Sequence, residues 1–169
     1  FVFIKNWGRS EKGSKYIHTL ILKIPLIGNI IYYSNIFQTA NLIATLLKSD
    51  INTTETLNLT SKTIENKYLK EKFDIAKTQI NEGVSIAQAL RSQKFMPDIA
   101  LDILGVGEDT GEISKSMSEV AENFKEELSR RLNQLTTLVS SLALAFAFTL
   151  VALIAIGIVT SVFQVSNSI

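Results

Sequence analysis

LVSSLALAFAFTLVALIAIGIVTSVF, residues 138–163, is the stretch of this sequence that decides the fold. It is apolar except for Gly157 and a few hydroxyl side chains, and no charged residue or histidine occurs from Leu132 to Ile169. At about 1.5 Å per residue, a helix of this length reaches roughly 39 Å, more than the ~30 Å of a bilayer's hydrocarbon core. The sequence therefore predicts a transmembrane helix over residues 136–165, followed by a short extracytoplasmic tail over residues 166–169.

Basic residues flank this segment on one side only. Arg130 and Arg131 precede it, whereas no charged residue follows it. Because basic flanks remain on the cytoplasmic side of a bacterial inner membrane, we expect residues 23–135 to form a cytoplasmic domain. Residues 1–22 begin with an apolar stub and continue with Lys and Arg. We interpret them as the end of a preceding membrane segment and a basic juxtamembrane linker, with a frayed terminus as the alternative for the stub.

The rest of the composition argues against several classes of function. A formal net charge of +1 gives no global field for nucleic acid binding. The chain has no cysteine and only one histidine, His18, so it lacks a thiolate zinc site and has little from which to build a Ser-His-acid triad. Residues 13–15, Gly-Ser-Lys, lack the earlier glycine of a phosphate-binding loop. We therefore predict no catalytic residue, no metal and no cofactor, and we expect any ATP hydrolysis to belong to a partner.

Apolar residues at helical spacing predict an all-α fold. The first helix, over residues 33–48, carries one apolar stripe: Ile36, Ala40, Ile43 and Leu47. The second opens at Asn52, which is placed to form a capping box with Glu55. The third stops at Gly83 and has its own stripe: Leu69, Phe73, Ala76 and Ile80.

The second half of the chain continues this pattern into the membrane. Ser85 and Gln88 are expected to cap a fourth helix, and Pro97 suits the first turn of a fifth. Residues 107–111, Gly-Glu-Asp-Thr-Gly, are expected to break that helix. From Glu112 the helical spacing continues without Pro or Gly as far as Ile156. The predicted architecture is a six-helix cytoplasmic bundle that continues into a C-terminal transmembrane helix.

Three acids gather at the break between the fifth and sixth helices: Glu108, Asp109 and Glu112. Their oxygens could bind a cation, but acids near a helix N-terminus are also favourable without any ligand. We favour the second interpretation.

Residues 107–113, GEDTGEI, resemble the G-E-x-T/S-G-x-L signature of type II secretion system protein F domains. The site residues that this resemblance implies are Gly107, Glu108, Thr110, Gly111 and Glu112. The two glycines are candidates for backbone geometry that a Cβ would obstruct, and the two glutamates are candidates for capping or for contacts.

Four further segments follow the order of motifs in the same family. Residues 24–28, IPLIG, resemble its I-P-x-x-G entry, and residues 42–47, LIATLL, resemble its L-x-x-L-L helix. Residues 82–90, EGVSIAQAL, resemble its G-x-S-L-x-x-A-L segment, and residues 95–97 stand where the family carries F-P. The motif residues in these segments are Pro25, Gly28, Leu46, Leu47, Gly83, Leu90 and Pro97.

Two departures from the family pattern affect details. Asp50 stands where the family usually has Gly, and Asp tolerates the left-handed conformation better than most residues. The prolines common near both ends of the family's last span are absent, with Thr136-Thr137 and Val159-Thr160 in those regions, so the sequence lacks the residues that would kink the helix there.

The resemblance covers residues 22–165 and implies an inner-membrane platform protein for type IV pilus or type II secretion pseudopilus assembly, multi-pass in its full-length form. The implied partners are an assembly ATPase, pilins or pseudopilins, other inner-membrane assembly proteins and membrane lipid, without nucleic acid. A homo-oligomer is also expected, because small residues lie four apart in the span, although alanine is ordinary filler in membrane helices. The rival interpretations are a membrane-anchored helical signalling module and a membrane-anchored hydrolase that uses the acidic turn.

Overall fold

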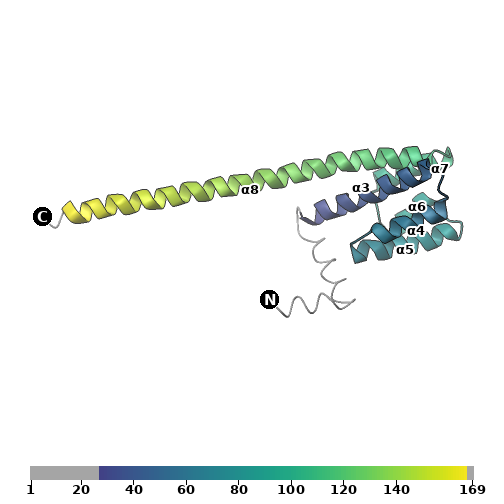
Figure 1. The fold of residues 1–169 in the computed structure, drawn as a ribbon, viewed down its shortest axis with the longest axis horizontal. Helices are drawn as coiled ribbons and strands as arrows, with labels where there is room; N and C mark the ends of the chain where they lie inside the picture. Colours follow the sequence, from purple (N-terminus) through teal and green to yellow (C-terminus); the bar gives the residue numbers. More distant parts are fainter. Residues whose placement is uncertain (1–26, 167–169) are drawn as a thin grey trace, which may run out of the picture. The chain divides into compact units, whose positions relative to one another are not determined.

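The computed structural model describes residues 27–166. This part of the chain contains six helices and no strand, which confirms the predicted all-α class (Figure 1). The helices are α3 (Ile27–Lys48), α4 (Thr53–Thr63), α5 (Lys67–Asn81), α6 (Ile86–Ser92), α7 (Asp98–Asp109) and α8 (Ile113–Ser166). The expectations for residues 1–22, for Pro25 and for residues 167–169 lie outside the described residues.

The chain divides into two compact units, residues 1–131 and residues 132–169. In the first unit, each helix from α3 to α7 packs against the next one along the chain. The beginning of α8 then returns to α3: the Ser114 hydroxyl donates to the Ala44 carbonyl at 2.9 Å, near the end of α3. The ring of Phe124 lies 5.7 Å from the ring of Tyr33, near the start of α3. The α3 helix and residues 113–131 of α8 therefore run antiparallel.

The core of the first unit takes side chains from all six helices. The rings of Phe73 and Phe95 meet at 5.3 Å, and both side chains are almost fully buried. The predicted stripes lie in this core, although the last residue of each, Leu47 and Ile80, is only partly buried at its edge. From α8, the side chains of Met117 and Val120 are fully buried.

Two of the predicted helix starts are present. The Asn52 side chain accepts a hydrogen bond from the backbone N–H of Glu55 at 2.8 Å, and the Ser85 hydroxyl accepts one from Gln88 at 3.2 Å. A third cap was not predicted: the buried side chain of Asn66 accepts from the backbone N–H groups of Tyr68 and Leu69 at 3.0 and 3.1 Å. Each cap satisfies backbone donors that have no partner inside the helix.

Three predicted boundaries are wrong by a few residues. The first helix begins at Ile27 rather than at residue 33. The apolar stripe starts only at Ile36, and residues 27–32 contain no proline that would prevent the helix from starting earlier. Pro97 is the N-cap of α7 rather than a residue of its first turn, since its ψ of 153° is extended. The fifth helix also continues through Gly107 to Asp109, so the break is confined to residues 110–112.

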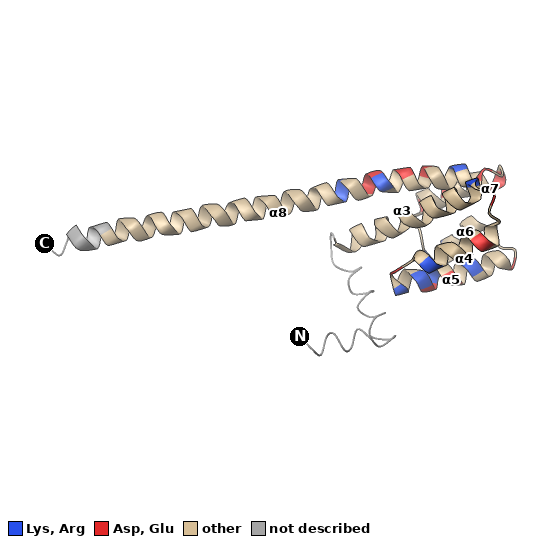
Figure 2. Ribbon diagram, viewed as in Figure 1, with Lys and Arg blue, Asp and Glu red and all other residues tan. Residues whose placement is uncertain are grey.

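The second unit is the apolar part of α8. Its most apolar 18-residue window has a mean hydropathy of 2.8 and no buried residue, and α8 is the one helix in residues 27–166 that is long and apolar enough to cross a membrane. Figure 2 shows no charged residue on the described part of this stretch. The hydroxyls of Thr149, Thr160 and Ser161 donate to carbonyls four residues earlier at 2.7–2.9 Å. These polar groups are therefore satisfied within the helix, as a lipid environment requires.

Candidate functional site

The acidic turn, residues 107–112, joins α7 to α8. The backbone N–H and the hydroxyl of Thr110 both donate to the Val106 carbonyl, at 3.1 and 2.9 Å, and so end α7. Gly111 has φ +74°, a left-handed value that costs an L-residue about 1–2 kcal/mol. No atom lies within 4 Å of a Cβ built at Gly111. Gly111 is therefore needed for the backbone conformation and not for space.

Gly107 has the opposite reason to be glycine. It lies inside α7 and is buried, and a Cβ there would overlap the side chain of Ser116 and lie 3.2 Å from the Glu112 carbonyl oxygen. The first turn of α8 thus approaches the backbone of α7 at this point. Gly107 permits the close approach of the two helices, and Ser116 is the small side chain that it accommodates.

Glu108 caps a helix that begins 22 residues earlier in the chain. One carboxylate oxygen accepts from the backbone N–H of Ile86 at 2.7 Å, and the other accepts from Ala87 at 3.1 Å. The Ser85 hydroxyl accepts from the third N–H, that of Gln88, so the carboxylate and the hydroxyl together satisfy the first three free donors of α6. A negative charge at a helix N-terminus is also favourable for the helix dipole. Glu108 therefore fixes the position of α7 against α6.

The other two acids of the turn do not share this role. Glu112 pairs with Lys115 at 2.9 Å, and both side chains are exposed. The hydrogen bond to Glu112, with the charge of the same carboxylate, raises the pKa of Lys115. Asp109 is exposed at the end of α7. No three acidic or histidine side chains in residues 27–166 are grouped so as to hold a metal ion, and the Glu108 oxygens already accept from backbone donors.

Besides Gly111 at the end of α7, three other helix ends in the first unit have one left-handed residue: Asp50 at φ 60°, Gly83 at φ 98° and Lys94 at φ 49°. At each end, the N–H that follows the left-handed residue donates to a carbonyl in the last turn of the helix, on Leu46, Gln79 and Leu90 in that order, at 3.0–3.1 Å. This is the Schellman arrangement. It confirms that Asp50 adopts the left-handed conformation expected of it, and that Gly83 ends α5.

The other predicted motif residues serve the packing of the bundle. Leu90 is fully buried, Leu47 packs against the edge of the core, and Gly28 is buried in α3. At the end of the first unit, Glu127 pairs with Arg130 at 3.2 Å and with Arg131 at 2.8 Å. The role of these residues in function stays a prediction.

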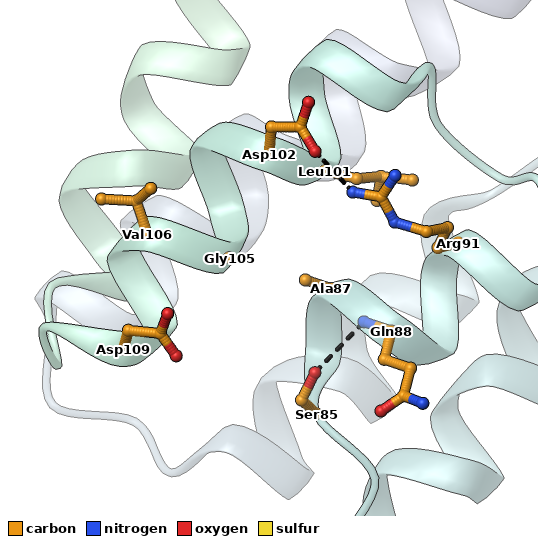
Figure 3. Close-up of a pocket in the computed structure, with 9 residues that line it drawn as sticks. All are labelled: Ser85, Ala87, Gln88, Arg91, Leu101, Asp102, Gly105, Val106 and Asp109. Atoms are coloured by element: carbon orange, nitrogen blue, oxygen red, sulfur yellow. Dashed lines mark hydrogen bonds and ion pairs between the residues drawn. The ribbon is translucent and has the colours of Figure 1, made fainter.

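A shallow groove lies between α6 and α7 (Figure 3). Arg91 crosses it and pairs with Asp98 at 3.0 Å and with Asp102 at 2.6 Å. The groove is lined by Ser85, Ala87, Gln88, Arg91, Leu101, Asp102, Gly105, Val106 and Asp109. The ion pair with Asp102 joins α6 to α7 across the groove.

Sequence patterns did not identify Ser116, Arg91 or Lys94. A small residue in the first turn after a G-E-x-T-G turn is the signal that could have identified Ser116, because only a small side chain fits beside Gly107. Arg91 of α6 pairs with Asp102 of α7, and Lys94 adopts a left-handed φ of 49°, which is rare for lysine. The spacing of neighbouring residues in the sequence therefore predicts neither feature.

Comparison with known proteins gives a consistent result. The model of the family described as "Type II secretion system (T2SS), protein F" matches residues 39–161. The type IV pilus assembly protein PilC of Pseudomonas aeruginosa is 25% identical over 167 residues, which are 99% of this chain and 45% of the relative. PilC of Thermus thermophilus is 26% identical over 161 residues, 95% of this chain and 40% of the relative. The type II secretion system protein F of Aeromonas hydrophila is 22% identical over 163 residues, 96% of this chain and 42% of the relative. The chain thus spans less than half the length of each of these relatives.

Proposed function

Because the chain belongs to the type II secretion system protein F family, we propose that it forms part of an inner-membrane platform on which a type IV pilus or a type II secretion pseudopilus is assembled. One observation carries the proposal: a single family match, residues 39–161, includes most of the helical bundle and nearly all of the apolar part of α8. Relatives named for pilus assembly and for type II secretion each match nearly the whole chain. The role is structural, and the proposal assigns no catalytic residue.

The proposed topology places the bundle in the cytoplasm. Arg130 and Arg131 precede the span and no charge follows it, which supports a cytoplasmic start of the membrane crossing. The chain lacks cysteine, so single cysteines report cleanly on this topology. In intact cells, Ser168→Cys should react with a membrane-impermeant maleimide, and Ser129→Cys should react only after lysis. The reverse pattern would overturn the topology.

The finer part of the proposal is mechanical coupling to an assembly ATPase. We infer that the ATPase engages the bundle and that α8 transmits its movement to the span, where pilins or pseudopilins enter the growing fibre. Support comes from the helical structure of α8 through residues 131–138 and from the contact of Ser114 with α3. Stiffness is needed for this transmission, and a pair of glycines would remove it.

Replacement of Thr136 and Thr137 tests the coupling. A Gly-Gly variant should lose fibre assembly or secretion while it still inserts into the membrane. The matched control is an Ala-Ala variant, which removes the same hydroxyls but keeps the helix stiff. These hydroxyls donate to the carbonyls of Leu132 and Asn133 at 3.0 and 2.9 Å. Normal assembly by the Gly-Gly variant, or equal loss in both variants, would refute coupling through the helix.

The broader platform role is tested separately. Deletion of the complete protein should abolish surface fibres or secretion, and its reintroduction should restore them. Affinity purification of the complete protein from membranes should recover an assembly ATPase. Retention of fibres and secretion after deletion would refute the role, and recovery of a sensor kinase instead of an ATPase would favour the signalling interpretation.

A further inference from the structure

The α3 helix is unlike its neighbours in the first unit. It has 22 residues, whereas α4, which packs against it, has 11. Figure 1 shows the first turns of α3 reaching past the nearest ends of α4 and α5. From Ile27 to Leu47 it carries no charged residue, and Figure 2 shows α3 without charge over most of its length. The beginning of α3 is thus an uncharged helix end with few neighbours from α4 and α5.

Apart from Gly28 and the exposed Asn29, the side chains at this end are apolar or aromatic. Ile27 is 45% exposed, and Ile30, Ile31, Tyr32 and Tyr33 are partly buried. The Tyr32 and Tyr33 rings lie 5.6 Å apart. Burial, with Tyr33 beside it, raises the pKa of Tyr32 to about 12, so its hydroxyl stays neutral. A tyrosine of this kind has an apolar ring and a hydrogen-bonding tip, which suits the boundary between lipid and water.

Contacts within the first unit locate this end. The Arg131 guanidinium lies 5.8 Å from the centre of the Tyr33 ring, and Arg131 also pairs with Glu127. Because α3 runs antiparallel to residues 113–131, its residues before Tyr33 lie at the end of the unit where Arg131 lies. Ile27 is six residues before Tyr33, about 9 Å further in that direction at 1.5 Å per residue.

The chain leaves this same end to enter the apolar segment. Leu138 follows Arg131 by seven residues, which span at most about 25 Å even when fully extended and about 10 Å as a helix. If residues 138–163 lie in lipid, the end of the bundle that holds Arg131 is within this distance of the hydrocarbon. The headgroup layer itself is roughly 5–8 Å thick on each side.

We propose that the first two turns of α3, residues 27–33, lie in the headgroup region of the bilayer and form a lipid-binding surface of the bundle. Their lack of charge means that nothing ionised is removed from water, and the exposed Ile27 gains an apolar environment. The Tyr33 ring and Arg131 mark the water-facing edge of this surface. The inference requires that α8 spans the membrane, and it does not depend on the platform role.

Spin labels on single cysteines test the surface, with the full chain reconstituted in lipid vesicles. The sites are Ile27→Cys and a matched control, Ile75→Cys on α5, because the two isoleucines are 45% and 44% exposed. Leu150→Cys reports on the span. Collision with oxygen indicates lipid, and collision with a nickel chelate indicates water. We expect the oxygen-to-nickel ratio at Ile27 to be several-fold above that at Ile75 and below that at Leu150.

Each other result overturns the proposal. A label at Ile27 that reads like the one at Ile75 would place α3 in water, and low access to both probes at Ile27 would place a protein partner there. A water-exposed label at Leu150 would remove the membrane from this end altogether. A label at Asn29, which is also exposed on α3, gives the same measurement if the Ile27 variant fails to fold.

Discussion

The strongest prediction concerns Glu108, because one side chain joins two helices. Truncation in Glu108→Ala removes both oxygens that accept from Ile86 and Ala87 at 2.7 and 3.1 Å. The two N–H groups would then have water as their only replacement partner. Glu112 offers the matched control, since it belongs to the same turn but pairs only with the exposed Lys115.

The size of the effect follows from the two bonds. A hydrogen bond to a charged group contributes about 1.5–3 kcal/mol, and partial exposure lets water recover part of it. We therefore expect Glu108→Ala to lower the free energy of unfolding of the bundle by about 2–3 kcal/mol. Glu108→Gln keeps one acceptor and should lose about 1 kcal/mol. Glu112→Ala should change nothing measurable, because exposed ion pairs contribute little.

Urea unfolding of the full chain in detergent micelles, followed by far-UV circular dichroism, measures the loss. With a slope of about 1.5 kcal/mol per molar urea, the midpoint for Glu108→Ala should fall by about 1–2 M. Hydrogen exchange at the amides of Ile86 and Ala87 should become about thirtyfold faster or more, which separates loss of the cap from a general effect. An unchanged midpoint, or an equal fall in Glu112→Ala, would refute the capping role.

Three further outcomes are expected. Gly107→Ala should lower the free energy of unfolding by about 1–3 kcal/mol, because the added Cβ overlaps Ser116. Gly105→Ala should raise the free energy of unfolding by up to about 1 kcal/mol, because the added Cβ touches only Ala87 at an ordinary 3.8 Å; thermal melts of both variants measure the two effects. Asp50→Gly should raise it by about 1 kcal/mol or less, because φ 60° costs glycine nothing; a lower urea midpoint would contradict this. Burial alone would raise the pKa of Asp74, but hydrogen bonds from Ser61 and Lys77 hold this pKa below its ordinary value of 3.8. The contribution of Asp74 to stability is therefore present above pH 3.8 and fades as the pH falls through the lowered pKa. Ser61→Ala should raise the pKa of Asp74 in a carboxyl NMR titration, and an unchanged pKa would contradict the role of Ser61.

Features that depend on residues close together in the chain were predictable. The helices and the caps at Asn52 and Ser85 follow from apolar spacing and from a polar side chain three residues before its donor. The left-handed turns at Asp50 and Gly83 follow from residue type. Lys94 shows the limit: a lysine adopts φ 49° because the chain must reverse to bury Phe95, and no local preference indicates this.

The internal organisation of the candidate site was predictable only in part. The family resemblance singles out residues 107–112, but the sequence places the helix break too early. Gly107 looks like a helix breaker by residue type, whereas in the structure it lies inside α7 and permits close packing against Ser116. The sequence also groups three acids that have different environments. Glu108 reaches α6 across 22 residues of sequence, whereas Glu112 finds Lys115 three residues away. Tertiary contact decides between these cases, and periodicity does not report it.

The return of α8 to α3 has a consequence for synthesis. Ser114 and Ala44 are 70 residues apart, so one face of α3 stays uncovered until the ribosome has made residues 113–131. The apolar segment is translated directly afterwards, within a few seconds at about 5–20 residues per second. The last step of bundle folding therefore coincides with synthesis of the apolar segment. Slow docking of residues 113–131 onto α3 would prolong the lifetime of a half-closed bundle, and such a species is prone to aggregation.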